Sequence, residues 1–72
     1  MNSVELLAYL RNYFPEVSYS ILFSSSFISI LNRNTFDKLV IGKDAVLYKG
    51  KWKIKDHSPI FMAQLYLNNK KS

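Results

Sequence analysis

The sequence predicts an α+β fold, in which a small antiparallel sheet of about four to five strands packs one face against an N-terminal and a C-terminal helix. Three observations predict it: apolar residues at helical spacing near the N-terminus, short β-branched and aromatic runs between polar turns, and an apolar stretch after a Ser-Pro pair. A chain of 72 residues supports one domain, since a chain of this size buries only about 60% of its unfolded-state surface.

The first predicted helix runs through Tyr13 and is capped by Asn2 or Ser3. Asn2 and Glu5 have the spacing of a capping box, in which each side chain satisfies a backbone group that the helix leaves unpaired. Pro15 disfavours helical geometry at the residue before it, so the helix should end there. The apolar stripe that should face the core consists of Leu6, Leu7, Leu10 and Phe14.

The stretch from Val17 to Leu31 is compatible with two strands or with one helix. Alternating residues predict a half-buried strand up to Phe23, and a second short strand from Phe27 would follow across a three-serine turn. A helical period also fits, through Tyr19, Leu22, Phe23, Phe27, Ile30 and Leu31. We favour strands, because serine and β-branched residues are mediocre helix formers and Ala, Glu, Lys and Gln are absent.

From Lys38 onward the sequence predicts a three-stranded meander. Its turns fall at Gly42 and Gly50, where glycine tolerates the positive φ that tight turns need. Its last strand would be residues 51–55, which brings the expected total to five strands.

The final helix should be capped by Ser58, with Pro59 at the first helical position, where its missing N–H costs nothing. Its apolar residues are too many for a solvated helix, so we expect it to lie against the sheet or a partner. Trp52 should belong to the core. It should pack with Ile54 and with residues of the final helix such as Phe61 or Leu65.

Little in the sequence points to enzyme chemistry. The absence of cysteine excludes disulfides, thiolate zinc sites and thiol nucleophiles, and one histidine with five scattered carboxylates makes a poor metal site. Asp56, His57 and Ser58 are the residue types of a hydrolase triad, but consecutive residues project in different directions. We therefore expect a protein that is not an enzyme and has no cofactor, no metal and no small-molecule substrate.

The composition also bears on where the protein works. The N-terminus lacks the basic region of a secretory signal, and the longest uncharged run, 17–32, is shorter than the roughly 20 residues of a spanning helix. We expect a cytoplasmic protein that does not enter a membrane. Abundant Lys, Asn, Ile, Tyr and Phe are typical of AT-rich coding DNA, as in a low-GC bacterium, its phages or other mobile elements.

Lysines at alternate positions between 49 and 55 are the most informative feature. On a strand they would share one face, about 7 Å apart per step, with Trp52 and Ile54 on the other. Residues 38–72 hold eight lysines and two aspartates, a net charge of +6, whereas residues 1–37 hold two arginines and three carboxylates, a net charge of −1. Such a row can follow a chain of phosphates.

We interpret the row as a nucleic-acid interface that binds the backbone with weak sequence specificity, because base recognition relies mainly on Arg, Asn and Gln. The expected interface residues are Lys43, Tyr48, Lys49, Lys51, Lys53 and Lys55. The competing interpretation is that these lysines stop an edge strand from pairing with other sheets.

A second hypothesis is a protein-interaction module, either a small inhibitor or a homodimer, since aromatic residues are enriched at interfaces. The expected interface residues lie on the final helix and are Phe61, Met62, Leu65 and Tyr66. The competing interpretation is that this helix spans the core. Salt separates the two hypotheses, because nucleic-acid binding collapses as salt rises and apolar protein binding does not.

Overall fold

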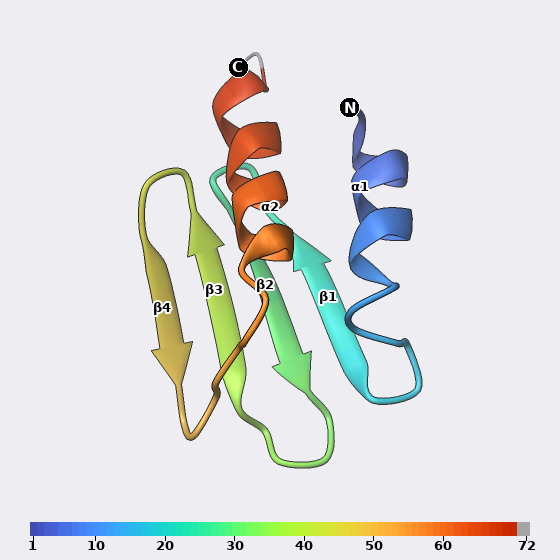
Figure 1. Ribbon diagram of the computed structural model, residues 1–72, viewed down its shortest axis with the longest axis vertical. Coiled ribbons are helices and arrows are strands. Elements are labelled where there is room, and N and C mark those ends of the chain that lie inside the picture. Colours follow the sequence, from blue (N-terminus) through green and yellow to red (C-terminus); the bar gives the residue numbers. More distant parts are fainter. Residues whose placement is uncertain (71–72) are drawn as a thin grey trace.

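The computed structural model describes residues 1–70, which form a four-stranded antiparallel sheet and two helices (Figure 1). The elements in chain order are α1 (Ser3–Leu10), β1 (Tyr19–Phe23), β2 (Phe27–Asn32), β3 (Lys38–Gly42), β4 (Val46–Lys49) and α2 (Ser58–Asn69). The strands lie in the sheet in the order β1-β2-β3-β4. Both helices pack on one face of this sheet, which confirms the predicted α+β class.

The helix α1 begins at the predicted capping box. The Asn2 side chain accepts a hydrogen bond from the Glu5 backbone N–H at 2.8 Å, and the Glu5 carboxylate accepts one from the Asn2 N–H at 3.0 Å. The regular helix ends at Leu10, before the predicted end at Tyr13, and the chain continues in turns.

Arg11 braces the chain between α1 and β1. Its Nη1 donates to the carbonyl of Phe14 at 3.1 Å and to the carbonyl of Tyr19 at 3.0 Å. The intervening turn is closed by a hydrogen bond from the Tyr19 N–H to the Pro15 carbonyl at 2.9 Å. These bonds fix the backbone at Phe14 and Tyr19, whose side chains line the candidate site described below.

The ambiguous stretch 17–31 forms two strands. In the antiparallel pairing of β1 with β2, Ile21 lies opposite Ile30 and Phe23 lies opposite Ile28. The preference for strands is confirmed, and the alternative of a continuous helix is wrong. The alternation of apolar and polar residues decides the outcome, because it gives the sheet one apolar face on which the helices can pack.

The fifth predicted strand is wrong. The strand β4 ends at Lys49, and residues 51–57 pair with no strand. Gly50 adopts φ 79°, which turns the chain away from the sheet before another strand can pair. Positive φ is thus confirmed at Gly50 but wrong at Gly42, which ends β3 and donates its N–H to the Ala45 carbonyl at 2.8 Å.

The helix α2 starts slightly differently from the prediction. Ser58 is the first helical residue, and His57 occupies the N-cap position without a side-chain hydrogen bond. The Asp56 carboxylate instead accepts from the Ser58 backbone N–H at 2.9 Å. Pro59 lies in the first turn, as predicted, and is buried.

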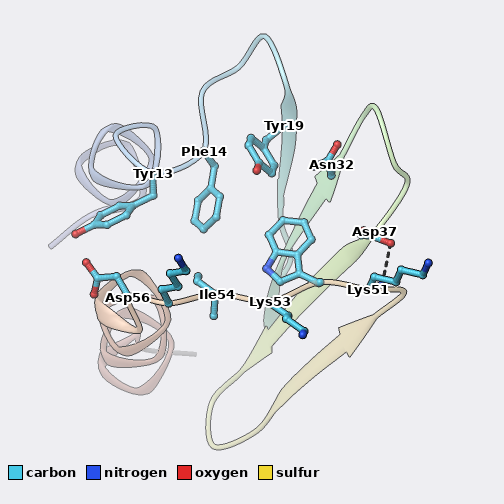
Figure 2. A pocket seen from close by; sticks show the side chains of 11 residues that line it. Tyr13, Phe14, Tyr19, Asn32, Asp37, Lys51, Lys53, Ile54 and Asp56 are labelled. Atoms are coloured by element: carbon cyan, nitrogen blue, oxygen red, sulfur yellow. Dashed lines mark hydrogen bonds between the residues drawn. The ribbon is translucent and has the colours of Figure 1, made fainter.

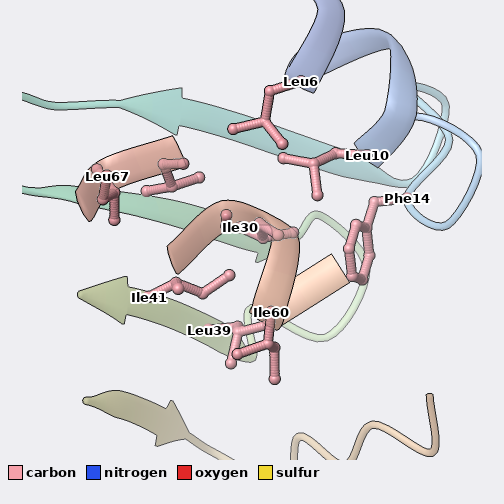
Figure 3. Packing of buried hydrophobic residues seen from close by; sticks show 10 residues of the cluster. Leu6, Leu10, Phe14, Ile30, Leu39, Ile41, Ile60 and Leu67 are labelled. Atoms are coloured by element: carbon pink, nitrogen blue, oxygen red, sulfur yellow. The ribbon is translucent and has the colours of Figure 1, made fainter. Parts of the chain in front are cut away.

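The core lies between the two helices and the inner face of the sheet (Figure 3). Antiparallel pairing sets Ile28 opposite Ile41 and Ile30 opposite Leu39, which forms its floor. The buried apolar residues are Leu6, Leu10, Phe14, Ile28, Ile30, Leu39, Ile41, Ile60, Ala63 and Leu67. Within residues 1–70, neither helix covers the opposite face of the sheet.

Candidate nucleic-acid interface

Residues 50–57 form an extended connection from β4 to α2 that crosses the inner face of the sheet (Figure 1). Asp37, just before β3, fixes its start by accepting a hydrogen bond from the Lys51 backbone N–H at 3.1 Å. Gly50 is needed for this contact, since a Cβ at that position would overlap the Asp37 carboxylate. The path of the connection therefore depends on one glycine and one aspartate.

Although this connection is not a strand, its side chains still alternate. Lys51, Lys53 and Lys55 are exposed, whereas Trp52 and Ile54 are half-buried and pack against the core. Extended backbone gives the same two-sided arrangement as a strand. The predicted separation of the lysines from Trp52 is therefore present on a connection between elements.

Trp52 packs against two aromatic side chains, one from the chain between α1 and β1 and one from the first residue of β1. Its ring centroid lies 6.1 Å from that of Phe14 and 5.7 Å from that of Tyr19. Tilted and edge-on geometries such as these are favourable for aromatic pairs. The predicted contact with Phe61 or Leu65 is wrong, because both side chains are largely exposed and the aromatic partners of Trp52 are Phe14 and Tyr19.

The lysines and the aromatic cluster border a single hollow of about 380 Å³, which we call the lysine hollow (Figure 2). In Figure 2, Phe14 and Tyr19 face the connection that carries Lys53 and Ile54. The residues that line the hollow are Tyr13, Phe14, Tyr19, Asn32, Asp37, Lys51, Trp52, Lys53, Ile54, Lys55 and Asp56. Lysines, aromatic residues and polar residues thus line one hollow, and the Lys51 and Lys53 side chains extend away from the rings of Phe14 and Tyr19 (Figure 2).

Two titratable groups at the edge of the hollow have shifted pKa values. Hydrogen bonds from the Ser58 hydroxyl and backbone N–H lower the pKa of Asp56, so this carboxylate is charged at neutral pH. A hydrogen bond with Tyr9, loss of hydration and the negative charge of Asp56 raise the pKa of Tyr13 to about 12. At neutral pH the edge of the hollow therefore carries the ionised carboxylate of Asp56 and the un-ionised phenol of Tyr13.

The other predicted interface residues lie elsewhere. Lys49 is on the opposite face of the sheet, directly across from Lys38 on β3. Tyr48 is exposed on β4 and does not line the lysine hollow. Lys43 lies in the turn between β3 and β4, at the other end of the sheet, where its carbonyl accepts a hydrogen bond from Asn68 at 2.9 Å.

One residue near the hollow was missed by the sequence analysis. Phe36 lies in the turn between β2 and β3 and is 76% exposed. Its neighbour Asp37 lines the lysine hollow, as does Asn32 at the start of the same turn. A bulky aromatic inside a polar turn was the available signal, since little in such a turn can bury it.

The predicted protein-interface residues fall into two groups on α2. Phe61 and Leu65 are 67% and 55% exposed, whereas Met62 and Tyr66 are half-buried. Tyr66 packs on Phe23 with ring centroids 6.0 Å apart. A second hollow of about 320 Å³ lies between the helices and is lined by Tyr9, Ser58, Phe61, Met62 and Leu65.

Within residues 1–70, no cluster of three or more His, Asp or Glu side chains is placed to hold a metal ion. Neither α1 nor α2 has the length and hydrophobicity to cross a bilayer.

Comparisons of the chain with protein-family models, curated proteins and solved structures find no match.

Proposed function

We propose that this protein binds nucleic acid through its sugar-phosphate backbone, with weak sequence specificity, at the lysine hollow. The observation that supports this best is that Lys51, Lys53 and Lys55 are exposed and line one hollow with aromatic residues. Cationic groups beside aromatic rings are the combination that proteins use to bind nucleic acid without regard to sequence.

The charges around the hollow favour an anionic ligand. The hollow is lined by three exposed lysines and two aspartates, a net charge of +1, and residues 38–72 as a whole carry +6. The Asp37 carboxylate accepts its hydrogen bond from the backbone N–H of Lys51 and not from the Lys51 ammonium group. Each ammonium group that meets a phosphate releases condensed counterions, so binding should weaken steeply with salt.

Weak specificity follows from the type of cation. Lysine is a flexible point charge with three donors, whereas bidentate recognition of guanine needs the planar fork of arginine. The two arginines of the chain are Arg11 and Arg33. Arg11 donates to backbone carbonyls, and neither arginine lines the lysine hollow.

The proposal is tested by titrating a fluorescent oligonucleotide with protein at low salt and following anisotropy. The double variant K53Q/K55Q removes two charges at the hollow, and K43Q/K70Q removes two charges at the far end of the sheet and of α2. We expect K53Q/K55Q to weaken binding by at least tenfold more than K43Q/K70Q does. Equal losses would mean that net charge, and not the hollow, governs binding.

A second candidate function is protein binding by the exposed side of α2. It is favoured by Phe61 and Leu65, which lie one helical turn apart, are largely exposed and border the second hollow. For the homodimer form of this candidate, sedimentation should show self-association that tolerates 0.5 M salt and is lost in Leu65→Glu. A monomer at every concentration contradicts it.

A further inference from the structure

Phe36 combines two features that each disfavour the folded state. Its ring is 76% exposed, so it gains little from burial. Its backbone adopts φ 65°, and it is the one non-glycine residue among residues 1–70 with positive φ. Left-handed backbone is unusual for any side chain and rare for a bulky one.

The turn around Phe36 explains its backbone but not its side chain. Asn32 begins the turn, and its side-chain oxygen accepts from the N–H groups of Asn34 and Thr35 at 2.9 and 3.1 Å. The Phe36 N–H then donates to the Asn32 carbonyl at 2.8 Å. Such one-turn structures commonly end on a left-handed residue, and glycine is the usual choice there. The needs of the turn therefore do not explain why position 36 is a phenylalanine and not a glycine.

The position of Phe36 relates it to the lysine hollow. Asn32 and Asp37, at either end of the turn, both line the hollow, and Asp37 is hydrogen-bonded to the backbone of Lys51. Phe36 does not itself line the hollow, but its exposed ring belongs to the turn that borders it. Strained residues that persist in a fold often belong to a binding site.

We infer that Phe36 is a base-stacking residue, which makes the ligand of the lysine hollow a single-stranded nucleic acid. This inference rests on the proposed function. An exposed aromatic face accepts any base, so it adds affinity without adding sequence specificity. A duplex cannot use it in the same way, because paired bases are already stacked on both sides and only unpaired bases are free to leave the stack.

The test compares three variants for binding to a labelled single strand and to a labelled duplex of the same length. Phe36→Gly removes the ring and the backbone strain, and Phe36→Trp keeps an aromatic face. Phe61→Ala is the matched control, since it removes another largely exposed ring, 67% against 76%, from α2. We expect Phe36→Gly to bind the single strand about 5- to 150-fold more weakly, with duplex affinity unchanged. Phe36→Trp and Phe61→Ala should bind like the parent.

Misfolding does not confuse this test, because Phe36→Gly should unfold at higher urea than the parent. If the parent binds the single strand and Phe36→Gly binds it with the same affinity, the stacking inference is wrong and the proposed function still stands. Parent protein that binds neither oligonucleotide overturns both. If Phe36→Gly instead abolishes self-association without altering nucleic-acid affinity, the ring belongs to a protein contact and the inference is wrong.

Discussion

Replacing Gly50 by alanine tests the geometry that positions the lysine hollow. Gly50 adopts φ 79°, a conformation that costs an L-residue about 1 kcal/mol. The added Cβ would also overlap the Asp37 carboxylate and lie 3.4 Å from the Asp37 Cα. If the carboxylate moves aside, its hydrogen bond with the Lys51 N–H is lost, at about 1 kcal/mol. We therefore expect Gly50→Ala to destabilise the fold by about 2 kcal/mol.

Urea unfolding followed by tryptophan fluorescence measures this loss. For a chain of this size the m-value is about 1 kcal/mol per molar urea, so the midpoint should fall by about 2 M. Gly42→Ala is the matched control, because Gly42 has no positive φ and its added Cβ would lie 3.4 Å from the Ala45 carbonyl oxygen. Its free energy of unfolding should change by no more than about 0.5 kcal/mol.

The double variant Asp37→Ala/Gly50→Ala separates the two causes. With the carboxylate removed, the overlap disappears, so the two substitutions together should cost less than the sum of their separate effects. Equal destabilisation by Gly50→Ala and Gly42→Ala would refute the account of how Asp37 and Gly50 hold the connection.

Two further predictions follow from the same region. Trp52→Ala should lower the free energy of unfolding by about 2 kcal/mol, less than the roughly 3–5 kcal/mol for a fully buried aromatic, because Trp52 is half-buried. Iodide should quench the tryptophan fluorescence of the parent only partly, and full quenching would contradict the packing of Trp52 on Phe14 and Tyr19. Because the pKa of Asp56 is lower in the folded than in the unfolded chain, its contribution to stability should be present at neutral pH and be lost as the pH falls below about 4. The free energies of unfolding of the parent and of Asp56→Ala, measured with urea, should therefore approach each other below that pH. A constant difference down to about pH 2.5 would count against the hydrogen bonds from Ser58.

Local signals in the sequence were sufficient for most of the fold. The capping box of Asn2 and Glu5 involves residues three apart, so chain spacing alone reveals it. The strands of 17–31 were harder, because two periods fitted the same residues. The choice was decided in the structure by an inner sheet face that buries Ile28 and Ile30 beneath the helices, a tertiary effect that spacing does not show.

The fifth strand failed because strand formation needs a partner. Residues 51–55 alternate like a strand, but Gly50 directs them across the inner face, where the rings of Phe14 and Tyr19 pack on Trp52. Those rings are more than 30 positions away in the chain. Alternation predicted which side chains would be exposed, and it could not predict which distant residues they would meet.

The candidate site was predicted only in part for the same reason. The lysines were identified by their spacing, yet Lys49 lies on the other face of the sheet because the chain turns immediately after it. Lys43 lies at the far end of the sheet, since β4 separates it from the hollow. Phe36 escaped notice because its exposure and its left-handed backbone are properties of the folded turn.

The salt dependence of binding by K51Q/K53Q/K55Q tests the central claim most directly. Affinity for a labelled single strand is measured from low to physiological salt, for the parent and for this variant. If each lysine neutralises one phosphate, the slope of log affinity against log salt should become shallower by about 2 units for a single strand and about 3 for a duplex. The variant should remain folded, since substitutions of exposed side chains usually change stability by no more than about 0.5 kcal/mol. An unchanged slope, or no binding of the parent to either oligonucleotide at low salt, would contradict nucleic-acid binding at the lysine hollow.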